Sequence, residues 1–280
     1  MSKAILLLLL TAAVMLPLQG QDVKVTRLHK DIIILHPGKA DDINEVRKAG
    51  GNVAAVRTDS GIVVFDSFIS EHAAETGLKL ILEYFPDVPV KYLINTHHHG
   101  DHTGGNSVFK NALSIAHENV QKRIPLKIDV SISADTVLFI GEKTFQLMYF
   151  GPAHTDSDII ILDKEDKLLI MGDLLCFRKS YILLPGSDVL NWINLLEKII
   201  GRKDEYKYVI PGHGAVTADY SALAGQRDYL QDLYQSVQYQ KKENITFEEA
   251  FKQMQFEAYK DYMLFEQISR DVKICWDQAE

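Results

Sequence analysis

The 280-residue chain has few cysteines and few tryptophans, with two of each. Cys176 and Cys275 are too few for a small disulfide-rich scaffold. They lie about a hundred residues apart, and spacing alone does not establish whether their backbones approach within bonding range. We favour two free, buried thiols, with a disulfide as the alternative.

Positive charge is also scarce. The chain has 30 lysine and arginine residues against 38 aspartate and glutamate residues, and its formal net charge is -8. A nucleic-acid-binding surface needs clustered lysine and arginine. The sequence has no such cluster, so we expect no nucleic-acid partner.

Long hydrophobic runs are absent except at the start of the chain. Residues 4–18 read AILLLLLTAAVMLPL and follow Lys3. A basic start before an apolar run of about 7–15 residues is typical of an export signal, and a transmembrane helix needs about 20 residues. We predict a signal peptide over residues 1–20 and a secreted or periplasmic protein that leaves the membrane after cleavage. An uncleaved membrane anchor is the alternative.

Short apolar runs of the β type recur through the rest of the chain, separated by single amphipathic helices. We expect strands at Val23–Leu28, Ile32–Leu35, Asn52–Arg57, Ile62–Phe65, Val90–Ile94, Leu113–Ala116, Val137–Ile140, Thr144–Tyr149, Ile159–Leu162, Leu168–Met171 and Tyr208–Ile210. Helices are expected after Ser70, after Ser187 or Asp188, and in the C-terminal third, where Thr246–Glu249 is a capping box.

Two mixed β-sheets with helices on their outer faces would bury all of these runs. We therefore predict an α/β (α+β) fold, a four-layer αββα sandwich. It would form a single domain over residues 21–280, with C-terminal helices over about 219–280. The polar segment Pro37–Gly51 is expected to be a mobile loop, and it could close over a site.

Four potential metal ligands follow the strand expected at Val90–Ile94, in a segment that reads NTHHHGDH. His97 and His99 occupy alternate positions of an extended segment and can face one metal ion. Asp101 and His102 follow Gly100, where the chain can turn, and can face a second metal ion. Imidazole and carboxylate are ligands that suit zinc. His98 alternates away from the metal ions.

Three further candidates, His154, Asp173 and His213, follow later strands and stand close to glycines. Each has a plainer explanation when taken alone, because a single histidine is most often a hydrogen-bonded residue and an aspartate beside glycine often forms a turn. The joint pattern favours a shared site, since five of the ten histidines fall at these strand ends.

With these residues in this order, the sequence resembles the metallo-β-lactamase superfamily over roughly residues 23–240. The motif H-x-H-x-D-H stands at 97–102, followed by the later His, Asp and His. The resemblance implies the αββα fold and two metal ions. It implies that the first ion is held by His97, His99 and His154, the second by Asp101, His102 and His213, and that Asp173 bridges the two.

The resemblance also implies a hydrolase that uses two zinc ions per chain, with iron or manganese as alternative metals. A hydroxide held between the ions would attack an ester, lactone, thioester or β-lactam carbonyl, with Asp101 orienting the nucleophile or relaying its proton. A β-lactam is disfavoured, because Asp173 and Cys176 stand where the β-lactamase branch has Cys and Lys. We expect a small-molecule substrate whose anionic group could meet Arg178 or Lys179.

Two other functions stay open at this point. One is a persulfide dioxygenase-like enzyme with a single iron, and the other is a non-catalytic metal-binding protein. Metal content separates these from the dinuclear hydrolase. Asp156 and Asp158 could orient imidazole rings, and Tyr181 could line a pocket. The sequence leaves the oligomeric state undetermined.

Overall fold

A computed structural model describes residues 23–39, 42–180, 182–216 and 220–279. The predicted signal peptide and Tyr181 lie outside these ranges. Among the described helices, none combines the length and the apolar character that crossing a membrane requires.

The first sheet has seven strands, which pair in the order in which they occur along the chain. The strands are β1 (Val23–His29), β2 (Ile32–Pro37), β3 (Val53–Thr58), β4 (Gly61–Phe65), β5 (Val90–Ile94), β6 (Leu113–His117) and β7 (Val130–Ile132). The first four strands pair antiparallel, and β4 to β7 pair parallel. The sheet is therefore mixed.

The second sheet has five strands in the order β12-β11-β10-β9-β8. The strands are β8 (Thr136–Ile140), β9 (Lys143–Met148), β10 (Ile160–Asp163), β11 (Leu168–Cys176) and β12 (Tyr208–His213). Neighbours from β8 to β11 are antiparallel, and β11 pairs parallel with β12. This sheet is mixed as well.

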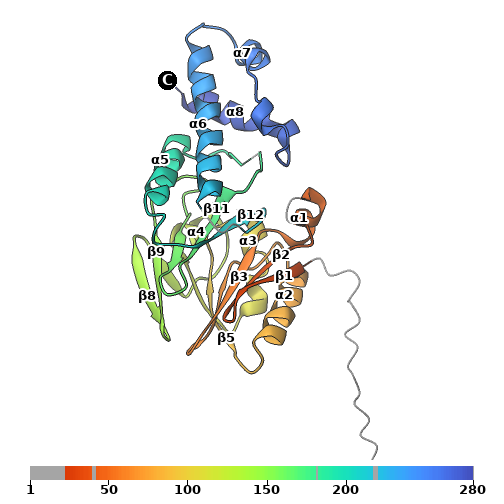
Figure 1. The fold of residues 1–280 in the computed structure, drawn as a ribbon, viewed down its shortest axis with the longest axis vertical. Coiled ribbons are helices and arrows are strands. Elements are labelled where there is room, and N and C mark those ends of the chain that lie inside the picture. The colour runs from red at the N-terminus through yellow and green to blue at the C-terminus, as the bar shows by residue number, and fades with distance from the viewer. Residues whose placement is uncertain (1–22, 40–41, 181, 217–219, 280) are drawn as a thin grey trace, which may run out of the picture.

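The two sheets pack face to face, with the green strands of the second sheet beside the orange strands of the first (Figure 1), and helices pack against their outer faces. Alternate residues of one strand point to opposite faces of a sheet. In β2, Ile32 and Ile34 enter the core between the sheets, whereas Ile33 and Leu35 enter the core beneath helix α2 (Glu71–Tyr84). Both faces are buried, which explains why these strands read as continuous apolar runs. The predicted four-layer αββα sandwich is confirmed.

Several helices were predicted together with their caps. The side chain of Ser70 caps α2, and Asp188, one of the two predicted candidates, caps α5 (Val189–Ile200). Thr246 and Glu249 form the predicted capping box of α7 (Phe247–Gln253). The remaining α-helices are α1 (Ile43–Ala49), α3 (Gly100–Thr103), α4 (Asn119–Arg123), α6 (Ser221–Lys241) and α8 (Ile268–Gln278).

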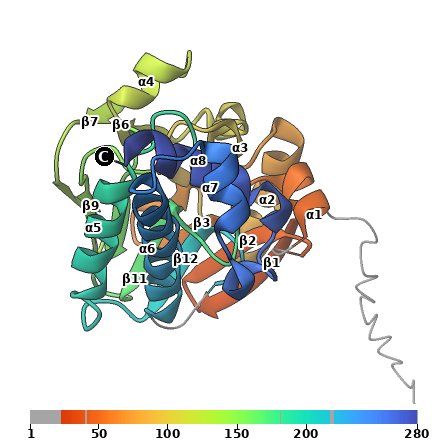
Figure 2. The same cartoon turned by 90° about the horizontal axis from the view of Figure 1, so that it is seen from above.

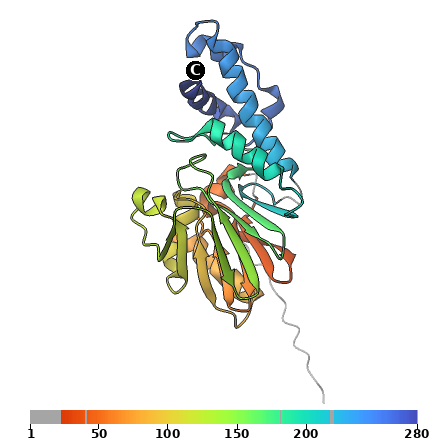
Figure 3. The ribbon, with the colours of Figure 1, turned by 90° about the vertical axis from the view of Figure 1, so that its left-hand side faces the viewer.

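Helices α6, α7 and α8 project from one end of the sandwich (Figures 1 and 3). α6 lies beside α5 (Figure 2), and both contribute to the core that covers the outer face of the second sheet. Residues of α8, including Val272 and Cys275, join the same core. Both cysteines are free and buried, as favoured from the sequence.

Two expectations from the sequence were wrong in detail. The segment Pro37–Gly51 contains α1, which Asp42 caps and which buries Val46 and Ala49, so it is not an unstructured loop over its whole length. The strand expected at Leu168–Met171 continues as β11 to Cys176, because a register shift at Gly172 carries it onward beside β12.

The parallel strands place their carboxyl ends at one edge of the sandwich. β4 and β5 end there in the first sheet, and β11 and β12 end there in the second. A backbone hydrogen bond from Asn52 N to Gly212 O (2.7 Å) joins the two sheets at this edge. Ligand sites in α/β proteins usually form at such ends.

A buried ion pair lies at the opposite end of the strands of the second sheet, away from the edge described above. Lys143 Nζ is 3.5 Å from Asp163 Oδ2, and their side chains are 5% and 0% exposed. Asp163 Oδ1 also accepts the backbone N–H groups of Glu165 and Asp166. Burial raises the pKa of Asp163 to about 6, although the charge of Lys143 opposes this shift.

This carboxyl group should make stability depend on pH. Its pKa in the folded chain lies above the value of about 3.9 in an unfolded chain. The folded state therefore binds more protons, and its stability contribution is present below about pH 4 and is lost as pH rises through about 6. Relative to Asp163→Asn, the wild type should lose about 2–3 kcal/mol of unfolding free energy between pH 4 and pH 7.

Urea unfolding of both proteins across that range measures the difference. Asp87→Asn, which changes an exposed carboxyl group, is the matched control and should follow the wild type. A constant difference between wild type and Asp163→Asn from pH 4 to pH 7 would contradict the prediction.

Candidate metal centre

The segment after β5 folds back on itself and presents its side chains to the sheet edge. Asn95 Nδ2 donates to the backbone oxygen of His102 (3.1 Å) and to Asn106 Oδ1 (3.1 Å). Thr96 N donates to Asp66 Oδ1 (2.8 Å). These bonds fix the turn before α3, so that His97 and His102 are buried while Asp101 keeps 29% of its side chain exposed.

The second sheet supplies Asp173 and His213 from within its strands, whereas the sequence placed them just after strands. Gly172 has φ +52, and the register shift of β11 at this residue turns Asp173 toward the edge. A Cβ on Gly212 would lie 2.0 Å from Asp173 Oδ1, so glycine is required there. His154 comes from the loop between β9 and β10.

The structure brings all seven predicted ligands together in two groups that share one carboxylate. Within each group the candidate ligand atoms lie within 4.8 Å of one another, and the groups are His97, His99, His154 and Asp173, and Asp101, His102, His213 and Asp173. Asp173 Oδ2 is 3.5 Å from His154 Nε2, whereas Asp173 Oδ1 is 3.1 Å from His102 Nε2. The two oxygens of Asp173 therefore face different groups.

Buried atoms of these groups lack ordinary partners. Among the described residues, the buried His97 Nε2 makes no hydrogen bond, and His102 Nε2 and Asp173 Oδ1, although 3.1 Å apart, do not meet in hydrogen-bond geometry. Leaving such atoms unpaired is costly. Imidazole nitrogen and carboxylate oxygen are also the donors that zinc prefers. The residues therefore fit divalent metal ions, and Asp173 belongs to both groups.

The protonation of His97 and His154 agrees with this fit, whereas burial would lower the pKa of His102 but the carboxylates of Asp173 and Asp101 raise it. Burial lowers the pKa of His97 well below its usual range and that of His154 to about 3, so both rings are neutral at pH 7 and offer lone pairs. Burial would raise the pKa of Asp173, but His213 and His102 hold it well below its usual range. The carboxylate is therefore ionised.

Residues that orient the rings were not the ones expected. Asp66 Oδ2 lies 2.8 Å from His102 Nδ1, and Thr96 Oγ1 lies 3.0 Å from His97 Nδ1. The backbone oxygen of Ile182 accepts from His154 Nδ1 (3.0 Å). Asp66 directly follows β4, whose parallel pairing with β5 places it beside the histidine segment. In the sequence, the position of Asp66 at the end of a strand was the only signal for its role as an orienting residue.

Asp156 and Asp158, proposed from the sequence as orienters, have other hydrogen-bond partners. Asp156 pairs with Arg123, and Asp158 accepts the backbone N–H and the hydroxyl of Thr155 (2.7 and 2.6 Å). His98 lies outside both groups and meets Ser157 Oγ (2.8 Å), consistent with its expected place beyond the metal ions.

A cavity of about 790 Å³ opens onto the two groups. Its apolar walls come from α1, from the loop between β4 and α2, from the loop after β11 and from the C-terminal segment, with Ile43, Val46, Ile69, Ile182, Leu184 and Leu264. Arg47, Lys179 and Arg270 supply positive charge. Arg178 instead lies 5.9 Å over the ring of Tyr262 and lines a different hollow. Of the two cations predicted near the site, only Lys179 lines this cavity.

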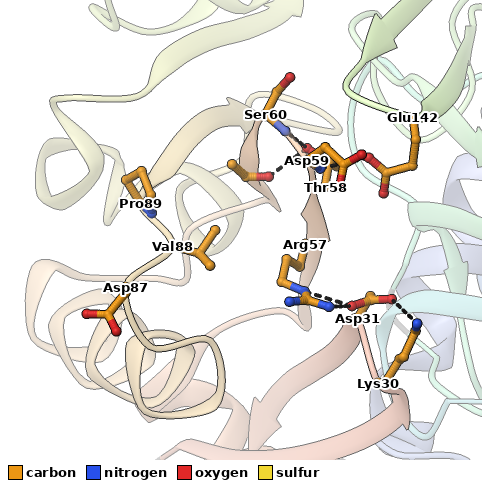
Figure 4. A pocket seen from close by; sticks show the side chains of 11 residues that line it. Lys30, Asp31, Arg57, Thr58, Asp59, Ser60, Asp87, Val88, Pro89 and Glu142 are labelled. Carbon is orange, nitrogen blue, oxygen red and sulfur yellow. Dashed lines mark hydrogen bonds and ion pairs between the residues drawn. The ribbon is translucent and has the colours of Figure 1, made fainter.

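Another polar hollow lies at the opposite end of the strands (Figure 4). Its arginine, Arg57, pairs with Asp31, and the carboxylate of Glu142 accepts the backbone N–H of Asp59. No histidine or cysteine is among the residues that line it. The metal-ligand chemistry is therefore concentrated at the other edge.

The glycine pair before β3 lies directly under the histidine segment. Gly51 N donates to Asp101 O (3.0 Å), and a Cβ on Gly51 would lie 2.2 Å from Cε1 of His102. The Gly51→Ala variant should therefore displace His102 and weaken the group that contains it. We expect zinc affinity of that group to fall roughly 10–100-fold, as when a ligand loses its orienting contact.

Competition with a chromophoric chelator measures this loss. Gly100→Ala is the control, because a Cβ at Gly100 meets nothing within 4 Å. If both variants bind zinc like the wild type, the predicted displacement of His102 does not occur.

Comparisons with known proteins agree with the architecture. Among curated proteins, residues of this chain are 26% identical over 169 residues to 2,4-dinitroanisole O-demethylase subunit alpha of Nocardioides sp., covering 57% of this chain and 51% of that protein. They are 33% identical over 103 residues to hydroxyacylglutathione hydrolase of Pelagibacter ubique, covering 35% and 42%. The chain thus spans about half the length of these curated relatives.

Solved structures share the fold. A metallo-beta-lactamase from Pontibacter korlensis superposes with a TM-score of 0.65 at 21% identity, over 75% of this chain and 99% of that one. A stereoselective inverting sec-alkylsulfatase from Pseudomonas sp. superposes with a TM-score of 0.74 at 14% identity, over 91% of this chain and 50% of that one. Residues 46–213, more than half of the chain, match the profile of the metallo-beta-lactamase superfamily. The chain belongs to the metallo-β-lactamase superfamily.

Proposed function

We propose that this protein is a hydrolase that uses two zinc ions per chain and in which water attacks the carbonyl carbon of an ester, lactone, thioester or β-lactam, so that the acyl C–O, C–S or C–N bond breaks. The observation that carries the proposal is the position of Asp173, whose two carboxylate oxygens face two separate sets of imidazoles. Relatives named as hydrolases support it, among them the hydroxyacylglutathione hydrolase and a type 2 metallo-beta-lactamase of Bacillus cereus that is 25% identical over 173 residues.

The seven side chains would hold the metal ions, and at least one of them would also orient the reactants. The chemistry that bound zinc supplies is Lewis acidity, which polarises a carbonyl group and acidifies water toward a pKa near 7. Asp101 is the candidate catalytic residue, because it lines the cavity and is the more exposed of the two carboxylates, at 29% against 6% for Asp173. It would accept a hydrogen bond from the attacking water and hold it against the scissile carbonyl.

The substrate would be a small molecule with an anionic group and an apolar body. Lys179 lines the cavity beside the two groups of candidate ligands. Burial would lower the pKa of Lys179, but the neighbouring Cys176 and Asp173 raise it, so the side chain stays charged. The apolar walls of the cavity would bind the rest of the substrate.

Elemental analysis and parallel assays with a chromogenic β-lactam, a lactone and a thioester test the proposed reaction. We expect about two zinc ions per chain and hydrolysis of at least one substrate, lost on chelation and restored by zinc. Asp101→Ala should lower kcat/KM by about 100-fold or more, because a positioned proton acceptor is removed.

Asp156→Ala is the matched control, since Asp156 is a nearby carboxylate that pairs with Arg123 outside both groups. It should keep the wild-type rate. The proposal of a dinuclear hydrolase would be contradicted by a chain that binds a single iron, or by one that retains no metal under any loading condition.

Lys179→Met tests the anionic substrate. It should raise KM roughly tenfold for a substrate that carries a carboxylate, which corresponds to about 1.4 kcal/mol of binding, and leave kcat unchanged. A neutral ester of the same shape should be hydrolysed equally by both proteins, and Lys179→Arg should restore most of the affinity. Equal KM changes for the charged and neutral substrates would refute the role of Lys179.

A further inference from the structure

His154 is oriented by a backbone oxygen that belongs to the loop after β11. The ring donates its Nδ1–H to Ile182 O at 3.0 Å, and an imidazole that donates from Nδ1 presents the lone pair of Nε2 to a metal ion. The position of this carbonyl therefore determines where Nε2 points. Lys179, Ile182 and Leu184 of the same loop line the cavity.

The C-terminal part of the chain holds this loop at two places. Ser180 N donates to Met263 O (2.9 Å), and Met263 N donates to Arg178 O (3.0 Å). Further along the loop, Ile182 N donates to Asp271 Oδ2 (3.2 Å) and Leu183 N donates to Asp271 Oδ1 (2.9 Å). One carboxylate thus accepts two successive backbone N–H groups.

Asp271 is itself firmly placed. It lies in the first turn of α8 and is 0% exposed. The hydroxyl of Tyr229, from α6, donates to Asp271 Oδ2 at 2.7 Å. A buried carboxylate is costly unless donors surround it, and the N–H groups of Ile182 and Leu183 and the hydroxyl of Tyr229 all donate to this one. The carboxylate is held between two helices and can act as a rigid support for the loop.

We propose that Asp271 is a positioning residue of the metal centre. Through the N–H groups of Ile182 and Leu183 it fixes the carbonyl that orients His154, and it fixes the cavity wall that Ile182 and Leu184 form. The C-terminal helices are in this way part of the site, although they supply none of the seven candidate ligands. The inference rests on the proposed metal centre.

The Asp271→Asn variant removes one half of this support without a change of shape. An amide keeps one acceptor oxygen, but its NH₂ group cannot accept the second backbone N–H. The loop should loosen at Ile182, and zinc affinity of the group that contains His154 should fall roughly 10–100-fold. The group formed by Asp101, His102, Asp173 and His213 should keep its affinity.

Tyr229→Phe is the matched control, because it removes a hydrogen bond from the same carboxylate and leaves both bonds to the loop. The full chain, stripped of metal, would be titrated with zinc against a chelator, and with cobalt to follow the absorption spectrum of each group. We expect Asp271→Asn to weaken one group and to alter its cobalt spectrum, and Tyr229→Phe to behave like the wild type. Wild-type binding by Asp271→Asn, or equal weakening in both variants, would overturn the role of Asp271.

Hydrogen exchange of the wild type provides a test that needs no variant to fold. The backbone amides of Ile182 and Leu183 should be as protected from hydrogen exchange as those of β10. Exchange at the rate of exposed loops would contradict the proposal that Asp271 supports this loop. The two proposals fail separately. A wild type that binds no zinc refutes the metal centre, whereas a wild type that binds two zinc ions beside an unaffected Asp271→Asn refutes only the positioning role.

Discussion

The carboxylate of Asp173 lies buried among the rings of His102, His154 and His213, and its charge must be compensated there. An ionised group removed from water is tolerated only with partners on every side. The surrounding backbone is shaped to allow this, since Gly212 leaves room for Asp173 Oδ1 and the shift in β11 turns the side chain inward. Both groups of candidate ligands are arranged around this one residue.

The sandwich explains how distant parts of the chain reach Asp173. In each sheet, parallel strands place their carboxyl ends at the same edge of the sandwich. The first sheet therefore positions the histidine segment at this edge, and the second sheet positions Asp173 and His213 there. Hydrogen bonds between the sheets fix their relative position, including Asn52 N to Gly212 O and Ile159 N to Thr96 O (2.9 Å). Buried apolar side chains of both sheets pack together between them, which supports the edge that carries the site.

Much of this arrangement could be predicted from the sequence, and the failures have physical causes. Buried strands and capped helices leave strong local patterns, and the spacing of the histidines marked the site. Helix α1 was missed because its segment is polar and only Val46 and Ala49 are buried. Asp66 was missed because a single aspartate at a strand end has no distinctive spacing. The bonds from Asp271 join residues 88 and 89 positions apart, which no local pattern reveals.

The hydrogen bonds of Asp271 also bear on the order in which the protein matures. During synthesis the histidine segment and both sheets leave the ribosome long before α8 does. A nascent chain can therefore stack its strands and gather six of the candidate side chains while the loop beside His154 still lacks its support. If Asp271 acts as proposed, full assembly of the site waits for one of the last helices, and a chain that stops short of α8 keeps every candidate ligand but lacks the carboxylate that supports the loop beside His154.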